Sequence, residues 1–227
     1  MRKKLALIGA VLAAALSWIV VSATTSGATP VPTACSGLYS NASFTSITVP
    51  ANTSCDISNS TVTGAVVVNK NASFKTCDST IGGSLTATQA YVNIDNGTTI
   101  GGAVDLNQPG VAVSIGTAPC GITGGSSQYS SILCPSSIGG SVSVHGGPRN
   151  GLEVSIGECA MCPTLPTRCE AMSIGGSVSI VNNQLPVEID NSYIAGSLIC
   201  VNNSPAVVNI ADTVHGATVG CIPTVFA

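Results

Sequence analysis

Charged and aromatic side chains are scarce in this 227-residue chain, at 7% and 4% of all residues. Seven residues are Lys or Arg and ten are Asp or Glu. Three of the cations stand together at positions 2–4, and the other four are Lys70, Lys75, Arg149 and Arg168. The net charge of the chain without its N-terminal basic residues 2–4 is therefore 4 − 10 = −6. A chain with so few cations cannot neutralise many phosphates, which excludes nucleic acid and an electrostatic membrane patch as partners.

The first 23 residues have the three parts of a secretory signal peptide. The basic residues precede an apolar run from Leu5 to Val21, and the small residues up to Ala23 provide a cleavage site. The run is short for a membrane span. We therefore expect cleavage after Ala23, a flexible mature N-terminus over residues 24–34, and a protein that is secreted or held at the cell surface.

A short motif of an aliphatic residue, a variable residue and glycine recurs seven times. Its copies are Val62–Gly64, Ile81–Gly83, Ile100–Gly102, Ile138–Gly140, Ile174–Gly176, Ile194–Gly196 and Val214–Gly216. Successive copies are 19, 19, 38, 36, 20 and 20 residues apart. Internal periods of this length indicate a solenoid. The glycines are expected to form corners, where the chain needs a positive φ or approaches the next coil closely.

Each motif is followed by the alternation typical of a strand with one buried face. Val142, Ser143 and Val144 illustrate the first alternating segment, and Val187 and Ile189 illustrate a second one later in the unit. We predict an all-β, single-domain parallel β-helix with two strands per coil, about seven to eight coils and a period of about 20 residues.

Two other folds also have repeated or alternating aliphatic residues. A left-handed helix needs an aliphatic residue every sixth position, and from Ile81 that frame reaches Ala87 and then Asn93, so a right-handed helix is favoured. An antiparallel sandwich also has alternating strands, but it has no reason to repeat one register seven times.

The two double-length spacings are consecutive, and the excess residues are 116–137 and 157–173. We expect insertions at the same corner of adjacent coils, where solenoids often carry binding loops. The alternative is a degenerate coil in each segment, although Ser126 and Gln128 would then occupy the interior of the first. The solenoid is predicted to span residues 35–221, with a tail over 222–227.

All ten cysteines lie beyond the signal segment, and an even number in an exported chain predicts disulfides. Cys200 and Cys221 are one coil apart, as are Cys55 and Cys77, so each pair is expected to join neighbouring coils. Within the insertions and the N-terminus, Cys120 is expected to pair with Cys134, and Cys35 with one of Cys159, Cys162 and Cys169.

The Cys-x-x-C motif in the second insertion has two alternative interpretations. A redox dithiol would need a thioredoxin-like context, which is absent. A zinc site would need a fourth ligand, and only His145 and His215 are available. No metal and no cofactor are therefore predicted there.

No nucleophile elbow, HExxH or paired-carboxylate motif occurs in the chain. If the protein is an enzyme, the ionisable residues nearest the insertions are the candidates: His145, Arg149, Glu153 and Glu158. A histidine beside carboxylates supports acid–base chemistry, and two carboxylates across a groove can cleave a glycosidic bond. Aspartates near the corners are explained by Asx turns, with stacked Ca²⁺ ligands as the alternative: Asp56, Asp78, Asp95, Asp190 and Asp212.

The leading hypothesis is a non-catalytic, secreted structural or surface protein. It would present two disulfide-clipped loops for adhesion to a carbohydrate or a cell-surface protein, and its open ends would allow self-association. The alternative is a carbohydrate-active β-helix enzyme, a lyase or hydrolase, with its site around residues 145–170. Six Asn-x-Ser/Thr sequons begin at Asn41, Asn52, Asn59, Asn71, Asn96 and Asn202.

Overall fold

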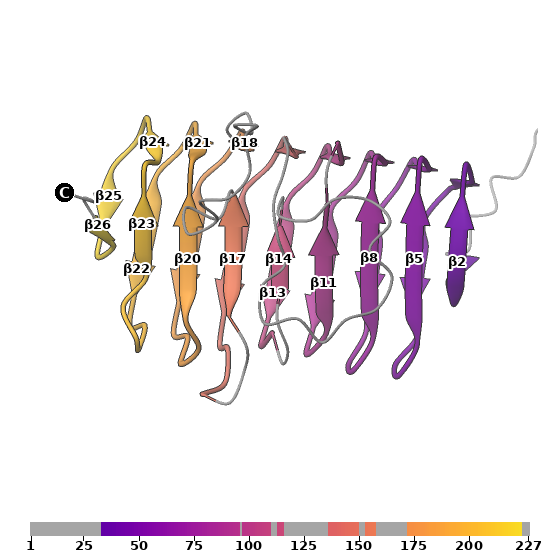
Figure 1. Cartoon of the computed structure of the whole chain (residues 1–227), viewed down its shortest axis with the longest axis horizontal. Coiled ribbons are helices and arrows are strands. Elements are labelled where there is room, and N and C mark those ends of the chain that lie inside the picture. The colour runs from indigo at the N-terminus through magenta and orange to yellow at the C-terminus, as the bar shows by residue number, and fades with distance from the viewer. Residues whose placement is uncertain are drawn as a thin grey trace, which may run out of the picture.

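The computed structural model describes residues 33–95, 97–109, 113–115, 136–149, 153–157 and 172–223. Throughout these residues the regular elements are β-strands, arranged in three parallel sheets. The chain passes through sheets A, B and C in turn and then begins the next coil, so the strands stack into a rod (Figure 1). The predicted parallel β-solenoid is confirmed.

Every coil contributes one strand to each sheet. Sheet A contains β1 (Thr33–Ala34), β4 (Ile47–Val49), β7 (Val66–Val68), β10 (Leu85–Thr88), β13 (Val104–Asn107), β16 (Val142–His145), β19 (Val178–Val181), β22 (Leu198–Val201) and β25 (Thr218–Val219). Sheet B contains β2 (Gly37–Ser40), β5 (Ser54–Ser58), β8 (Ser73–Cys77), β11 (Tyr91–Ile94), β14 (Val113–Ile115), β17 (Val154–Gly157), β20 (Val187–Asp190), β23 (Val208–Ile210) and β26 (Ile222–Pro223). Sheet C contains β3 (Ser43–Phe44), β6 (Thr61–Val62), β9 (Thr80–Ile81), β12 (Thr99–Ile100), β15 (Ser137–Ile138), β18 (Met172–Ile174), β21 (Ser192–Ile194) and β24 (Thr213–Val214).

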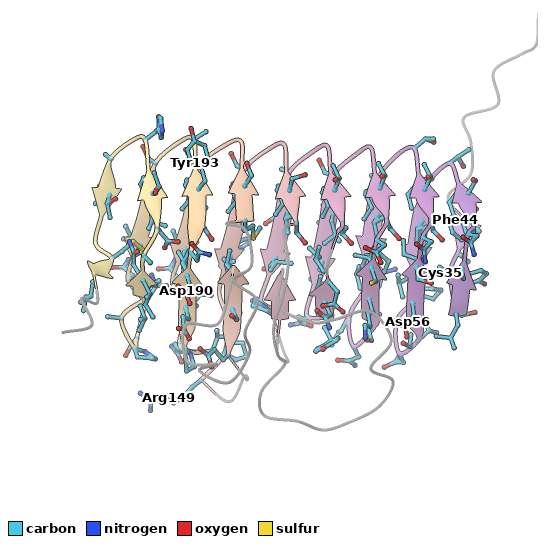
Figure 2. All side chains as sticks on the ribbon, turned by 45° about the horizontal axis from the view of Figure 1, so that its top comes forward. Cys35, Phe44, Asp56, Arg149, Asp190 and Tyr193 are labelled. Atoms are coloured by element: carbon cyan, nitrogen blue, oxygen red, sulfur yellow. A yellow bond between two sulfur atoms is a disulfide. The ribbon has the colours of Figure 1, made fainter. Side chains whose placement is uncertain are left out.

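The described residues form eight complete coils and a ninth coil that has strands in sheets A and B. The chain rises through sheet B, crosses over in sheet C and descends in sheet A while it advances along the rod, so the winding is right-handed (Figures 1 and 2). The first and last strands, β1 and β26, extend the solenoid two residues beyond each predicted boundary.

The prediction of two strands per coil is wrong, because the recurring motif forms a third strand. Its aliphatic residue is not part of a corner but the inward-facing residue of a short strand in sheet C. These side chains stack in register from coil to coil and six of them are almost completely buried: Val62, Ile81, Ile100, Ile138, Ile174 and Ile194. A strand of two residues is too short to show an alternating pattern, which hid it in the sequence.

The interior is filled by columns of aliphatic side chains that run the length of the rod. In sheet A the inward pairs follow one another in register, as when Val142 and Val144 stack beneath Val178 and Ile180. Burial of one such side chain stabilises the fold by about 1.5–3 kcal/mol. Because each coil touches only its neighbours, stability accumulates along the stack.

The glycine that ends each motif is required by close packing rather than by an unusual φ. None of these glycines has a positive φ. A Cβ built on Gly83 would lie 2.7 Å from the carbonyl carbon of Gly64 in the preceding coil and 2.8 Å from the nitrogen of Ala65. The corner between sheets C and A therefore lets successive backbones stack where a side chain would separate them.

The two interruptions of the repeat are insertions, not degenerate coils. Strand β12 pairs directly with β15, and β15 pairs directly with β18, so no coil lies between them. Both interruptions leave sheet B and re-enter at sheet C, which is the same corner of adjacent coils. The insertion residues 116–135 and 158–171 lie outside the described part of the chain.

The other two corners use residues in the left-handed conformation, most of them asparagine. Between sheets A and B these are Asn52, Asn71, Gln89, Gln108, Asn182 and Asn202; between sheets B and C they are Asn41, Asn59, Asp78, Asn191 and Ala211. Asparagine and aspartate tolerate this conformation better than most residues. Five of the six sequon asparagines occupy such positions and are exposed, so turn chemistry explains why asparagine stands there.

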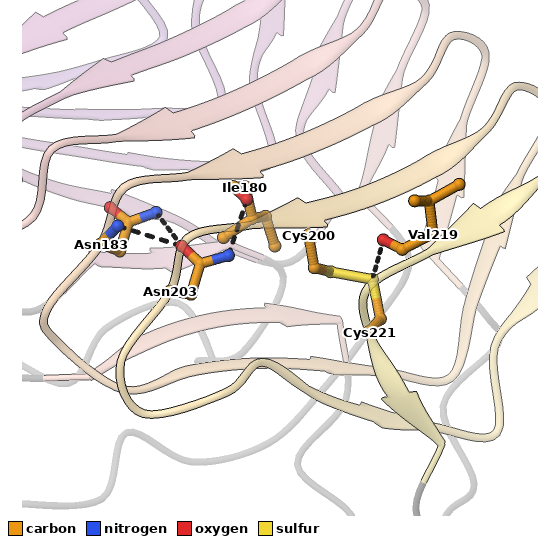
Figure 3. The surroundings of a disulfide bond; sticks show 6 residues. All are labelled: Ile180, Asn183, Cys200, Asn203, Val219 and Cys221. Atoms are coloured by element: carbon orange, nitrogen blue, oxygen red, sulfur yellow. Dashed lines mark hydrogen bonds between the residues drawn. A yellow bond between two sulfur atoms is a disulfide. The ribbon is translucent and has the colours of Figure 1, made fainter.

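A buried asparagine ties three coils together near the corner between sheets A and B. Asn183 is fully buried; its side chain accepts a hydrogen bond from the backbone of Gly147 at 2.9 Å and donates to the carbonyl of Val144 at 3.0 Å. It also donates to Asn203 Oδ1 at 3.1 Å, and Asn203 donates to the carbonyl of Ile180 at 2.8 Å (Figure 3). A buried amide must have such partners, since an unpaired one costs about 1–3 kcal/mol.

Candidate functional site

Two disulfides join the terminal coils to their neighbours. Cys35 pairs with Cys55, 20 residues away, and Cys200 pairs with Cys221, 21 residues away. The pairing of Cys200 with Cys221 was predicted and is confirmed (Figure 3). The dashed line between Cys221 and Val219 in that figure marks a 3.6 Å contact between the sulfur and a carbonyl oxygen.

The predicted pairing of Cys55 with Cys77 is wrong, as is that of Cys35 with a cysteine of the second insertion. The spacing could not separate the two choices, because Cys35, Cys55 and Cys77 recur at intervals of about one coil. Cys77 is disulfide-bonded to a cysteine other than these four, since they pair with one another. Cys120, Cys134, Cys159, Cys162 and Cys169 lie outside the described residues, so their predicted pairings stay predictions.

The outer face of sheet C carries a row of hydroxyl groups that runs along the rod. One outward residue from each coil stands in register with the next: Ser43, Thr61, Thr80, Thr99, Ser137, Ser173 and, after Tyr193, Thr213. Neighbouring strands of a sheet are about 4.8 Å apart. Ser137 Oγ lies within hydrogen-bond distance, 3.3 Å, of Thr99 Oγ1.

The surface beside this row is almost bare of side chains in the central coils. The next outward position is Gly82, Gly101, Gly139 or Gly175 in four successive coils. The row therefore borders a flat strip in which hydroxyl groups are the main side-chain groups presented to a ligand.

An aromatic pair interrupts the row near its C-terminal end. Tyr193 is 39% exposed, and its hydroxyl lies 3.0 Å from Nε2 of His215 in the next coil. The two ring centroids are 5.0 Å apart. Tyr193 lies on the edge of the rod formed by sheet C (Figure 2). A partly exposed aromatic ring beside hydroxyl groups offers an apolar face and hydrogen-bonding groups together.

The sequence contained a signal for this row that the repeat analysis missed. In all seven motifs the residue before the aliphatic one is Thr, Ser or Tyr. While the motif was interpreted as a corner, nothing defined whether the side chain of that residue points inward or outward. Once the motif is recognised as a strand, period-two alternation places it on the outer face.

A group of carboxylates lies in the C-terminal half of the rod. Glu153 precedes β17, and Glu188 lies half-buried in β20 of the next coil. Burial raises the pKa of Glu188 to about 7, helped by its hydrogen bond with Glu153 and by the charges of Glu153 and Asp190. Burial likewise raises the pKa of Asp212 to about 7, although Asp212 Oδ1 accepts a hydrogen bond from the backbone of Ser192.

These raised pKa values predict that the protein becomes less stable as the pH rises. Both carboxyls bind protons more tightly in the folded state, so the stabilisation present below pH 4 is lost as the pH passes through about 7. We expect the melting temperature to fall by several degrees between pH 5 and pH 8, as measured by circular dichroism. The variant Glu188→Gln/Asp212→Asn should flatten this dependence, and an unchanged slope in that variant would refute the assignment.

The candidate catalytic residues do not come together on one surface. His145 is on the outer face of sheet A, where Nε2 lies 3.2 Å from Oδ1 of Asp105 and both side chains are partly exposed. Glu153 faces outward beside sheet B, and Arg149 is exposed at the corner between the sheets (Figure 2). Glu158 lies outside the described residues. The carboxylate facing Glu153 is Glu188, which was not among the candidates.

The corner aspartates do not form a stack of calcium ligands. Asp56 lies on the outer face of sheet B, Asp78 lies at a corner, and Asp95 is fully buried with Oδ2 3.6 Å from Nζ of Lys75. Within the described ranges no three His, Cys, Asp or Glu side chains are placed to hold a metal ion together.

Comparison with known proteins identifies no relative: no protein-family model, no curated protein and no solved structure matches the chain. A search of the described residues for a helix long and apolar enough to cross a membrane finds none.

Proposed function

We propose that this protein is an exported structural rod that binds a neutral carbohydrate along sheet C and has no catalytic activity. The coarse part of this proposal is compatible with the fold, because the disulfides indicate an oxidising environment. The low charge of the chain and its largely aliphatic interior support a structural role.

The observation that carries the ligand class is the in-register hydroxyl row that Tyr193 interrupts near its C-terminal end. A neutral polysaccharide is itself a repeating array of hydroxyl groups with apolar ring faces. The row offers matching hydrogen-bond partners, and the exposed tyrosine offers a surface on which a sugar ring can pack. The two insertions are proposed to contribute to adhesion from the corner next to this same sheet.

A glycan array with the processed chain tests the ligand class, followed by calorimetry on any glycan that binds. Tyr193→Ala is expected to weaken binding about tenfold, since an aromatic contact contributes about 0.5–1.5 kcal/mol beyond its buried area. Thr80→Val and Thr99→Val remove hydroxyls at almost constant volume and should each weaken binding by a few fold. Tyr91→Ala, which removes a tyrosine from sheet B, is the matched control and should bind normally.

Two results would overturn this proposal. Equal losses in Tyr91→Ala and Tyr193→Ala would show that sheet C is not the binding face. Cleavage of the bound glycan that disappears in Glu153→Gln or His145→Ala would show that the protein is a carbohydrate-active enzyme instead.

A further inference from the structure

In the part of the chain that the structure describes, both ends of the rod are open parallel strand edges. Strands β1, β2 and β3 each pair with one neighbour only, and so do β24, β25 and β26 at the other end. In the described residues neither end is covered by a helix or by another strand. An open edge presents backbone groups that can pair with a further strand running in the same direction.

Exposed apolar side chains gather at these two ends. Seven large apolar side chains are exposed in the described residues, and five of them belong to the first coil or to the last two. Leu38 of β2 is 76% exposed, Ile222 of β26 is 56% exposed and Val219 of β25 is 50% exposed. Central coils carry polar residues at the position of Leu38, such as Asp56, Lys75, Asn93, Ser155 and Glu188.

The register of the sheets shows what a second copy would meet at each end. Val208, Ile222 and the next copy's Leu38 would form one outward apolar row in sheet B. In sheet A, Val219 would adjoin Ala34. In sheet C, β24 belongs to the eighth coil, so one strand position would separate Thr213 from Ser43 of the next copy. The outward rows of sheets A and B thus keep their chemistry across the junction.

The interior also matches at the two ends. Tyr39 and Phe44 close the first coil with rings 5.5 Å apart, and both are only half-buried. Val214 and Cys221 are the half-buried residues packed against the core at the opposite end. Stacking of one copy on another through sheets A and B would further bury the side chains of Tyr39 and Cys221.

We infer that the rods assemble head to tail, with β25 and β26 of one copy pairing with β1 and β2 of a second copy. The two surfaces are different, so the contact is heterologous and does not close; it generates a filament rather than a dimer. This inference does not depend on carbohydrate binding.

The test is sedimentation of the processed, oxidised chain over a range of concentrations, with electron microscopy of the largest species. The wild-type chain should form filaments that lengthen with concentration. Leu38→Lys and Ile222→Lys should each require at least tenfold more protein to assemble, because each places a charge in the apolar junction. An equimolar mixture of these two variants retains one intact junction and should stop at dimers.

Val67→Lys is the matched control, since Val67 is an exposed valine on the outer face of a central coil. It should assemble like the wild type. The inference is overturned if the wild-type chain stays monomeric at every concentration, if the mixture yields no dimer, or if Val67→Lys blocks assembly as strongly as the end variants. Circular dichroism of each variant establishes that its coils are folded.

Discussion

Replacing Gly140 with valine is expected to prevent the fifth and sixth coils from stacking. A Cβ at this position would lie 2.8 Å from the backbone nitrogen of Ala103 and 2.9 Å from its Cα, both in the preceding coil. Gly140 also donates a hydrogen bond to Gly102 and accepts one from Gly176. These contacts involve backbone atoms, which cannot move aside without breaking the hydrogen bonds that join the corners of successive coils.

Overpacking a well-filled interior costs about 1–3 kcal/mol and occasionally more, and we expect about 3 kcal/mol or more here because the backbone itself must shift. That is a large share of the about 5–15 kcal/mol by which a typical domain is stable. Urea unfolding followed by circular dichroism measures the loss. The control is Ser143→Val, which adds the same side chain on the outer face of the same coil. Similar stabilities for the two variants would show that the corner tolerates a side chain.

Loss of a terminal disulfide is expected to have the second largest effect. Removing a cross-link that closes a loop of about 20 residues destabilises a protein by about 3 kcal/mol. In a solenoid the terminal coil buries least and has one neighbour, so the loss should appear as fraying of that coil. In Cys200→Ser/Cys221→Ser we expect hydrogen exchange to accelerate over residues 213–223 and to stay slow over residues 66–106.

The two terminal disulfides should also differ in their response to a reductant. Cys35 and Cys55 are fully buried, whereas Cys221 is partly exposed. Mild reduction should therefore break the Cys200–Cys221 disulfide first, which mass spectrometry after alkylation can follow. Simultaneous reduction of both disulfides would contradict this order.

The repeat was enough to predict the fold because equivalent positions in successive coils of a solenoid recur at a regular interval in the sequence. Val142 and Val178 occupy the same place in their coils, and the sequence showed this before any pairing was known. The insertions were predicted for the same reason, since an interruption is visible against a regular period.

What the sequence could not provide were the third sheet and the disulfide partners. Strands such as Thr80–Ile81 are too short to alternate, so their outward hydroxyls were mistaken for corner residues. Cys55 lies one coil from both Cys35 and Cys77, and spacing cannot choose between equal distances. The facing of Glu153 and Glu188 was missed because the second insertion separates these residues in the chain while their coils are adjacent.

The position of the two terminal disulfides has a mechanical consequence. If the chain is pulled from its two termini, the load enters the rod at Cys55 and Cys200, because it passes through the sulfur–sulfur bonds and not around the enclosed loops. Strands β1 and β26 lie outside the two cross-links and are loaded directly, whereas the loops 35–55 and 200–221 add no length to the extending chain. The extension of the pulled chain is thus set by the residues between Cys55 and Cys200, and the two cross-linked terminal loops contribute nothing to it.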